Sequence, residues 1–278
     1  LTQNEMTVQR IWTGKEHFEV TGNGYEPDGD FLVNGEQIEK SHDKALAELL
    51  RCGMLCNDSA LVERDGDVKT EGDPTEGALL TTAWKYGLDI ETEREKYPRI
   101  DTIPFESEYQ YMATLHQLSN ENIVYLKGSI EKVSAMCDKL STAQIEEIHK
   151  QVDDYALDGL RVLAFAKKHV NSEIQSIAHN DVEGGLEFMG IQAMIDPPRS
   201  EALEAVHNSR KAGILVKMIT GDHVATATAI ARKLVLEEKL TRSHGITGAE
   251  MKKLNPETFS EVAAQKSVFA RVNPSQKL

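Results

Sequence analysis

The sequence predicts an α/β protein in two parts: an antiparallel sheet with flanking helices, and an incomplete, doubly wound parallel sheet. Short strand-like runs separated by turn residues follow one another through much of residues 8–166, and strands that are neighbours in sequence tend to pair antiparallel. After residue 195, apolar runs alternate with helical patterns, which indicates a parallel sheet. At 278 residues the chain is long enough for two domains that each bury a core.

The composition excludes several classes of protein. With 31 basic and 45 acidic residues, the net charge is −14, which argues against a nucleic-acid-binding surface. An anionic ligand would need Lys or Arg side chains placed locally. No apolar run reaches the roughly 18 residues of a membrane-spanning helix. The chain opens on Leu1 without an initiator Met or a signal peptide, so it is expected to be excised from something longer.

Three cysteines are too few for a disulfide framework, and their scatter fits a reducing compartment. Cys52 and Cys56 lie one helical turn apart, which is compatible with a metal-binding pair. No other thiol or well-spaced His completes such a site. We therefore expect Cys52, Cys56 and Cys137 to be core thiols.

The first part opens with a predicted hairpin of strands 18–20 and 31–33, followed by a helix over 45–55. A second helix is expected to begin at Pro74, because Asp73 suits the cap and Pro suits the first helical position. Glu76 falls in its first turn. An acid there usually answers only the helix dipole, so function is the minority interpretation on local grounds.

A β meander follows, with strands over 111–118, 123–126 and 160–166. Phe105 precedes it and is either a core side chain, the default, or a flat platform for a base. Lys127 ends a strand beside Gly128, which lets a ligand approach the backbone, although such a Lys is equally compatible with solvated surface. Arg161 enters a strand after a turn and suits phosphate or sugar contacts, with a structural ion pair as the alternative.

The second part is organised around an apolar run, 214–219, which predicts a strand buried on both faces. Before it, the prolines after Asp196 form a rigid turn into a helix over 200–211. Thr220, Gly221 and Asp222 then end the strand and open the next helix, at the edge where open α/β sheets bind ligands. The bland alternative is a turn with an Asx cap. A further strand over 267–272 continues the doubly wound pattern.

Eight motifs occur in a fixed order along the chain. They are Leu-Thr-Gln-Asn-Glu-Met6, Gly-Asp-Pro-Thr-Glu-Gly-Ala-Leu79, Pro-Phe-Glu-Ser-Glu-Tyr-Gln-Tyr-Met112, Lys-Gly-Ser-Ile-Glu131, Asp-Gly-Leu-Arg-Val-Leu163, Asp-Pro-Pro-Arg199, Met-Ile-Thr-Gly-Asp-His223 and Phe-Ala-Arg-Val-Asn-Pro-Ser-Gln-Lys277. In this order they resemble the cytoplasmic headpiece of P-type cation-transporting ATPases, from the first residue to the last. The pattern is most similar to the calcium-pump-like branch.

The resemblance implies a domain layout and a nucleotide site. A nucleotide-binding domain, residues 10–192, would be inserted into a haloacid-dehalogenase-like phosphorylation domain formed by 1–9 and 193–278. Phe105 would stack on adenine and Glu76 would approach its edge. Lys127 and Gly128 would line the base and ribose pocket, and Arg161 would reach toward the phosphates.

The resemblance also implies a catalytic set in the phosphorylation domain. Its expected members are Thr220, Gly221, Asp222, Asp196, Arg271 and Lys277. Thr220, Gly221 and Asp222 would hold the transferring phosphoryl group and its magnesium surroundings, with Asp196 and Arg271 nearby. Lys277 would neutralise charge on the phosphoryl group.

The full pump would transfer the ATP γ-phosphate to an aspartate and hydrolyse the product while moving ions. ATP and Mg²⁺ are the expected cofactors, with the Mg²⁺ ligands largely outside this chain. The expected partners are the transmembrane, actuator and remaining phosphorylation-domain segments of the same polypeptide, with no nucleic acid. The expected location is the cytoplasmic side of a membrane, the plasma membrane in particular, and the isolated chain is expected to be a monomer.

Several departures qualify the resemblance. The family's Asp-Lys-Thr-Gly-Thr would lie just before Leu1 and its Gly-Asp-Gly-x-Asn-Asp beyond Leu278, so the chain alone is expected to bind nucleotide without autophosphorylation or turnover. Gln110 stands where many relatives carry Lys, and Ile130 replaces a Pro, so weak affinity is expected. The transported ion is not readable, because such pumps bind ions in membrane helices.

Two rival functions stay open at this point. A haloacid-dehalogenase-type phosphatase would require an Asp-x-Asp nucleophile motif after the first strand, and none precedes the predicted insert. A stand-alone nucleotide-binding module would need no chemistry of its own.

Overall fold

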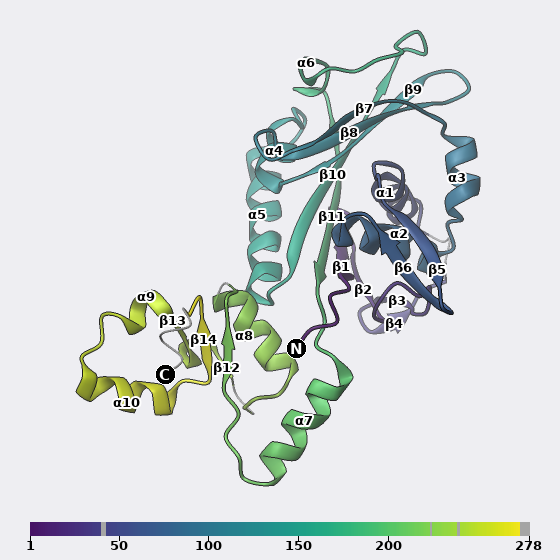
Figure 1. The fold of residues 1–278 in the computed structure, drawn as a ribbon. Helices are drawn as coiled ribbons and strands as arrows, with labels where there is room; N and C mark the ends of the chain where they lie inside the picture. Colours follow the sequence, from purple (N-terminus) through teal and green to yellow (C-terminus); the bar gives the residue numbers. More distant parts are fainter. Residues whose placement is uncertain (40–42, 223, 238–239, 273–278) are drawn as a thin grey trace. The chain divides into compact units, whose positions relative to one another are not determined.

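The computed structural model describes residues 1–39, 43–222, 224–237 and 240–272 (Figure 1). Two compact units divide the chain. The sheet unit comprises Asn4–Val152 and Arg161–Ile195, and the edge unit comprises Leu1–Gln3, Asp153–Leu160 and the residues from Asp196 onward. The domain boundaries at 9/10 and 192/193 stay a prediction.

The sheet unit is built on a nine-stranded sheet in which each pair of neighbours is antiparallel, in the order β4-β3-β2-β1-β11-β10-β9-β8-β7 (Figure 1). Its strands are β1 Thr7–Trp12, β2 His17–Val20, β3 Phe31–Val33, β4 Glu36–Gln37, β7 Arg99–Glu106, β8 Tyr111–Gln117, β9 Asn122–Gly128, β10 Arg161–Val170 and β11 Glu187–Ile195. The predicted hairpin, β2–β3, and the predicted meander are confirmed.

Helices cover both faces of this sheet (Figure 1). The helices along this part of the chain are α1 Lys44–Leu55, α2 Pro74–Tyr86, α3 Ile90–Lys96, α4 Ile130–Ala135, α5 Thr142–Leu157, whose last residues belong to the edge unit, and α6 His179–Val182. Helix α1 packs on β9, β10 and β11, and α2 packs on α1 and β1. Helix α4 packs on β9 and β10 from the opposite side (Figure 1).

Local sequence explains where α1 and α2 begin. Asp43 caps α1 by accepting a hydrogen bond from the Leu46 N–H at 2.9 Å. Asp73 caps α2 by accepting one from the Thr75 N–H at 2.7 Å, and Pro74 occupies the first turn. Gly87 ends α2 in the left-handed conformation, φ 98°. Both predicted helix starts are confirmed to within one residue.

The three thiols are buried and unpaired, as predicted for core cysteines. Cys52 and Cys56 lie in the main core with Leu49, Leu50 and Leu79. Burial raises the pKa of both thiols, and it raises that of Cys137 to about 12. These groups are therefore protonated and unreactive at neutral pH.

A two-stranded ribbon, β5 Ala60–Arg64 and β6 Asp67–Glu71, packs against α2 and was not predicted from the sequence. Two glycines admit it. A Cβ atom on Gly77 would collide with Thr70 of β6, and one on Gly72 would collide with Ser59, which precedes β5. The ribbon consequently lies close to the amino end of α2.

The edge unit carries a small parallel sheet in the order β12-β14-β13. Its elements are α7 Ser200–Lys211, β12 Met218–Thr220, α8 Val224–Lys233, a 3-10 turn η1 Arg242–His244, β13 Gly245–Thr247, α9 Gly248–Met251, α10 Pro256–Gln265 and β14 Val268–Ala270. Parallel strands alternate with helices here, as predicted, and Ile246, Met251 and Phe269 form a small buried core.

The predicted strand over 214–219 is wrong in extent and burial. Strand β12 begins only at Met218, and Ile214 and Leu215 are 59% and 84% exposed. The apolar run indicated a central strand, which has neighbours on both sides and covered faces. In the described residues β12 is an edge strand that pairs only with β14, so nothing buries the first half of the run.

No helix in the described residues is both long enough and apolar enough to cross a membrane.

Candidate functional site

Strand register brings three of the predicted site residues to one end of the nine-stranded sheet. Glu106 of β7 pairs with Tyr111 of β8, Tyr111 pairs with Gly128 of β9, and Gly128 pairs with Ala164 of β10. Phe105 directly precedes Glu106 in β7, and Lys127 directly precedes Gly128 in β9. Arg161 is the first residue of β10. Three strands of this four-stranded stretch, β7, β9 and β10, therefore carry them at the same end.

Lys127 and Arg161 lie on the face of the sheet that α1 and α2 cover. Lys127 pairs with Phe165 of β10, so these two side chains share a face. The Phe165 ring faces α1, because a Cβ atom on Gly53 of α1 would lie 3.4 Å from it. Side chains alternate along a strand, so Arg161 is on the same face as Phe165.

A β-bulge turns Phe105 toward this face. The register of β7 against β8 shifts between Ile103 and Glu106. Met112 pairs with Lys127 and shares its face, so the adjacent Tyr111 points to the other side of the sheet. Glu106 pairs with Tyr111 and points the same way, which leaves Phe105 on the side of Lys127. The three side chains thus project from the same face of the sheet, and their role as one site stays a prediction.

Phe105 is not a core residue. Its side chain is 57% exposed, although it follows the buried Ile103 in the same strand. The default interpretation of Phe105 as core is therefore wrong. The bulge, which is not readable from the local sequence, removes the ring from the packed row.

Lys127 is not a solvated surface lysine, which was the structural alternative for this residue. Its side chain is only 7% exposed, and its ammonium donates a hydrogen bond to Glu76 Oε1 at 2.6 Å. Glu76, 15% exposed, extends from the first turn of α2. The acid therefore does more than answer the helix dipole: it neutralises a buried cation.

The second oxygen of Glu76 is held by two residues that the sequence did not single out. The Asp58 N–H donates to Oε2 at 3.0 Å and the Ser59 hydroxyl donates to it at 2.9 Å. Asn57 donates from its side chain to the Glu76 carbonyl at 2.9 Å. The only sequence signal was a cluster of turn-forming residues after α1, which gave no indication of the partner.

Arg99 fixes this segment, residues 57–59, from behind. Its guanidinium donates to Asp58 Oδ1 at 2.6 Å and to the Leu55 carbonyl at 2.8 Å, and it also contacts the Asn57 carbonyl. A planar guanidinium with several partners restricts its neighbours strongly. The Glu76 carboxylate is therefore oriented by a braced segment.

Arg161 has an exposed side chain near the cap of α2. Burial disfavours ionisation of Asp73, but hydrogen bonds from Thr75 and Glu76 and the positive charge of Arg161 outweigh it, so the pKa of Asp73 is lowered. The charge of Arg161 thus acts on the amino end of α2, which itself favours anions.

Gly128 has a structural reason. A Cβ atom there would lie 2.6 Å from the Gln110 carbonyl oxygen and 2.8 Å from Tyr111 Cβ. Close approach of β8, rather than of a ligand, already requires a glycine. Ile130 is the first residue of α4, after the cap Ser129. Pro is favoured at that position, and a buried Ile satisfies it as well.

Residues of the second predicted set gather at the carboxyl edge of the small parallel sheet. The Thr220 hydroxyl donates to Asp222 Oδ2 at 2.8 Å and accepts from the Asp222 N–H at 3.1 Å, so these residues do form a local turn. Thr220 pairs with Ala270, and Arg271 follows with φ 49°. Apart from Gly221 and its two chain neighbours, no described residue has an atom within 4 Å of the position that a Cβ on Gly221 would take.

Asp196 directly follows β11 and belongs to the edge unit, where it is partly buried. Lys277, and His223 of the motif at 218–223, lie outside the described residues. In the part of the chain that the structure describes, no three His, Cys, Asp or Glu side chains are grouped so as to hold a metal ion.

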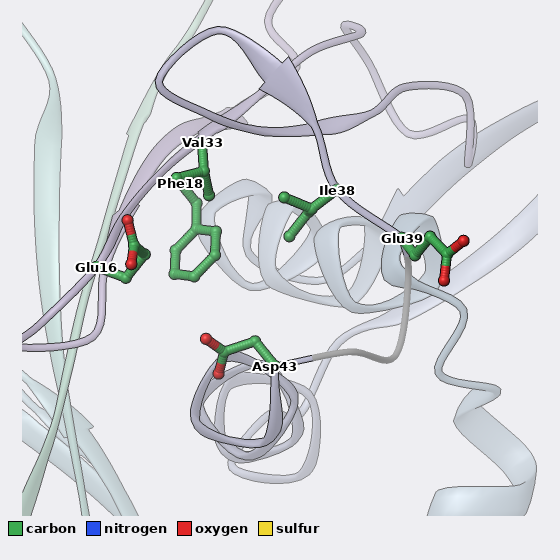
Figure 2. Close-up of a pocket in the computed structure, with 6 residues that line it drawn as sticks. All are labelled: Glu16, Phe18, Val33, Ile38, Glu39 and Asp43. Atoms are coloured by element: carbon green, nitrogen blue, oxygen red, sulfur yellow. The ribbon is translucent and has the colours of Figure 1, made fainter.

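A cavity of about 430 Å³ lies elsewhere in the sheet unit (Figure 2). Phe18, Val33 and Ile38 form its apolar lining, and the carboxylates of Glu16, Glu39 and Asp43 stand around them (Figure 2). Three carboxylates repel phosphate groups. The cavity therefore does not compete with the Glu76–Lys127 region as a site for an anionic nucleotide.

Together, these features define a mixed α/β protein whose large antiparallel sheet presents an aromatic ring, an ammonium and a guanidinium at one end. The model of a family described as P-type ATPase, cytoplasmic domain N, matches residues 45–201. The chain belongs to this family, as the order of its motifs predicted.

Relatives match the chain along its whole length. It is 46% identical to cation-transporting ATPase pma1 of Synechocystis and 35% identical to a calcium-transporting ATPase of Bacillus subtilis. It is 34% identical to human calcium-transporting ATPase type 2C member 1. The match covers 100% of this chain in each case, but only 32%, 32% and 30% of these relatives. The chain thus spans about a third of their length, and the two rival functions are not favoured.

Proposed function

We propose that this chain is the ATP-binding cytoplasmic portion of a P-type cation-transporting ATPase. In the whole pump it would present ATP for phosphoryl transfer to an aspartate, and the reaction would drive ion transport across a membrane. The family match and the relatives support the general assignment. The details below rest on the geometry of the sheet unit.

The Glu76–Lys127 pair carries the proposal. Of four acceptor positions on the Glu76 carboxylate, the described residues fill one on Oε1 and two on Oε2. One acceptor position on Oε1 is left beside an ammonium that has donors to spare. Adenine offers a donor, its amino group, next to an acceptor, its ring nitrogen, so the pair and the base are complementary. Guanine has the reverse order at that edge.

Phe105 and Arg161 would complete the site. The exposed Phe105 ring is free to stack on the base, which contributes about 1–3 kcal/mol in other nucleic-acid sites. Arg161 would meet the phosphates, helped by the amino end of α2. These local charges matter because the net charge of −14 repels a nucleotide at long range.

The second unit would supply the phosphoryl-transfer machinery. We assign Thr220, Gly221 and Asp222 to the phosphoryl group, with Asp196, Arg271 and Lys277 around it, in a haloacid-dehalogenase-like domain of residues 1–9 and 193–278. The donors fit Mg²⁺ only in part: Asp222 and Thr220 are oxygen ligands, but they do not make up an octahedral set. Mg²⁺ would accompany the ATP phosphates and supply charge neutralisation there.

The remaining partners would belong to the same polypeptide: its transmembrane, actuator and further phosphorylation-domain segments. The location would be the cytoplasmic side of a membrane, the plasma membrane in particular. Because these 278 residues contain no Asp-Lys-Thr-Gly-Thr, the chain alone should bind ATP without turning it over. Steady phosphate release by pure protein that is lost when Lys277 is changed would contradict this.

A nitrogen-15 NMR titration with ATP tests the site. Resonances of Phe105, Lys127 and Arg161 should shift together, with an affinity in the submillimolar range. Arg161→Gln should weaken binding, whereas Arg64→Gln, which changes an exposed arginine of the ribbon, should not. If millimolar ATP leaves all three resonances unchanged, the proposed site is wrong.

A further inference from the structure

Ser59 has the geometry of a hydrogen-bond relay rather than of a packing residue. It is 2% exposed and immediately precedes β5. Its hydroxyl oxygen accepts a hydrogen bond from the Asp73 N–H at 2.9 Å. Its single proton is then available for Glu76 Oε2 at 2.9 Å, which is a closer and charged acceptor compared with the Asp73 carbonyl at 3.4 Å.

This contact decides how the Glu76 carboxylate is turned. The last torsion of a Glu side chain is broad, so packing alone does not fix the two oxygens. Ser59 and the Asp58 N–H together occupy both acceptor positions of Oε2. Oε1 is thereby left toward Lys127 with its remaining acceptor position open.

The fold makes room for the Ser59 hydroxyl. Gly72 has φ 120°, and a Cβ atom there would collide with Ser59 Oγ. The Ser59 backbone is held as well, because its N–H donates to Asn57 Oδ1 at 2.9 Å. Because the backbone of Ser59 is hydrogen-bonded and Gly72 leaves space for its side chain, the hydroxyl can occupy only a small range of positions.

We propose that Ser59 is a positioning residue that orients Glu76 so that the site prefers adenine to a base without an exocyclic amino group at that edge. The inference rests on the proposed function. Removing the hydroxyl would free the carboxylate to rotate, and the acceptor for the adenine amino group would be lost part of the time. The backbone, Lys127 and Phe105 would stay in place.

Binding of ATP and of inosine triphosphate, which carries an oxygen in place of the amino group, tests this in the 278-residue chain by calorimetry. Ser59→Ala should weaken ATP binding about five- to tenfold and leave inosine triphosphate within about twofold, so the preference collapses. Thr82→Val is the matched control. It removes another buried hydroxyl of the same region, one that donates to the Ala78 carbonyl at 2.7 Å, and should leave the preference unchanged.

A purely structural role for Ser59 would weaken both nucleotides alike, and an unchanged ATP preference in Ser59→Ala would overturn the inference while leaving the proposed function intact. Absence of ATP binding by the unchanged chain would overturn both. If Ser59→Ala does not fold, a crystal structure of the unchanged chain with ADP decides. Ser59 Oγ should stay within hydrogen-bond distance of Glu76 Oε2, and a Glu76 turned away from Ser59 would refute the inference.

Discussion

The Lys127–Glu76 ion pair is expected to stabilise the sheet unit only as a pair. The 2.6 Å contact joins side chains that are 7% and 15% exposed, so either charge alone would be left largely desolvated. Breaking a buried pair costs about 3–5 kcal/mol. Lys127→Met should lower the free energy of unfolding by about 2–3 kcal/mol. This loss lies at or below the lower end of that range, because Glu76 keeps its hydrogen bonds from Ser59 and Asp58.

Glu76→Gln should cost about 3 kcal/mol, since it strands the more deeply buried ammonium. The double variant removes both charges, and its cost should be only about 1–2 kcal/mol. The coupling free energy in a double-mutant cycle is therefore expected to be about 3–5 kcal/mol. Compared with two uncharged side chains, the ion pair thus adds little to the free energy of unfolding, whereas the loss of either charge alone is clearly destabilising.

Urea unfolding followed by tryptophan fluorescence measures these free energies. Both tryptophans of the chain, Trp12 and Trp84, lie in the sheet unit, so the signal reports on that unit. Arg10 and Glu19 form the control pair: their contact is 3.5 Å, the side chains are 38% and 50% exposed, and the coupling should stay below about 1 kcal/mol. A Lys127–Glu76 coupling no larger than that of the control would refute the reasoning.

Three further predictions concern the Phe105 ring, the His116 imidazole and the three thiols. Phe105→Ala should weaken ATP binding by about 1–3 kcal/mol, which calorimetry measures. It should change the free energy of unfolding, measured in urea, by less than about 0.5 kcal/mol, because the ring is mostly exposed. A large loss of stability would restore the core interpretation. His116 donates a hydrogen bond from Nδ1 to the Tyr97 carbonyl at 2.9 Å, and burial lowers its pKa to about 4. Below pH 6.5 the unfolded state therefore takes up the proton before the folded state does. The free energy of unfolding should fall by up to about 3 kcal/mol as the pH drops toward 4. His116→Gln should remove this part of the pH dependence, and an identical pH profile in the variant would contradict the assignment. The three thiols should react with a disulfide reagent only as fast as the sheet unit opens; rapid reaction of the folded chain would show that burial does not protect them.

The sequence predicted those parts of the sheet unit whose signals are local. The helix start after Asp73, the helix over 45–55, the hairpin of β2 and β3, and the meander follow from capping residues and hydrophobic periodicity, and the structure agrees. The family also followed from the order of short motifs, which needs no coordinates. Burial of the run over 214–219 did not follow, because an apolar segment becomes a central strand only when a sheet provides neighbours on both sides.

The candidate site was only half accessible to sequence reasoning. The resemblance assigned Glu76, Phe105, Lys127 and Arg161 to one nucleotide pocket, but the local sequence left each of them with a structural alternative. Their meeting depends on the register of four strands and on one bulge, and these are set by packing between segments far apart in the chain.

What sequence by itself determined about this protein is its family and those elements whose signals lie in neighbouring residues, such as the start of α2 and the hairpin of β2 and β3. Only the tertiary structure decided that a buried ammonium meets a carboxylate 51 positions away and that Ser59 holds that carboxylate in place. The reason is physical: removing charges from water is costly, so partners for buried groups are selected by the folded surroundings rather than by the adjacent chain.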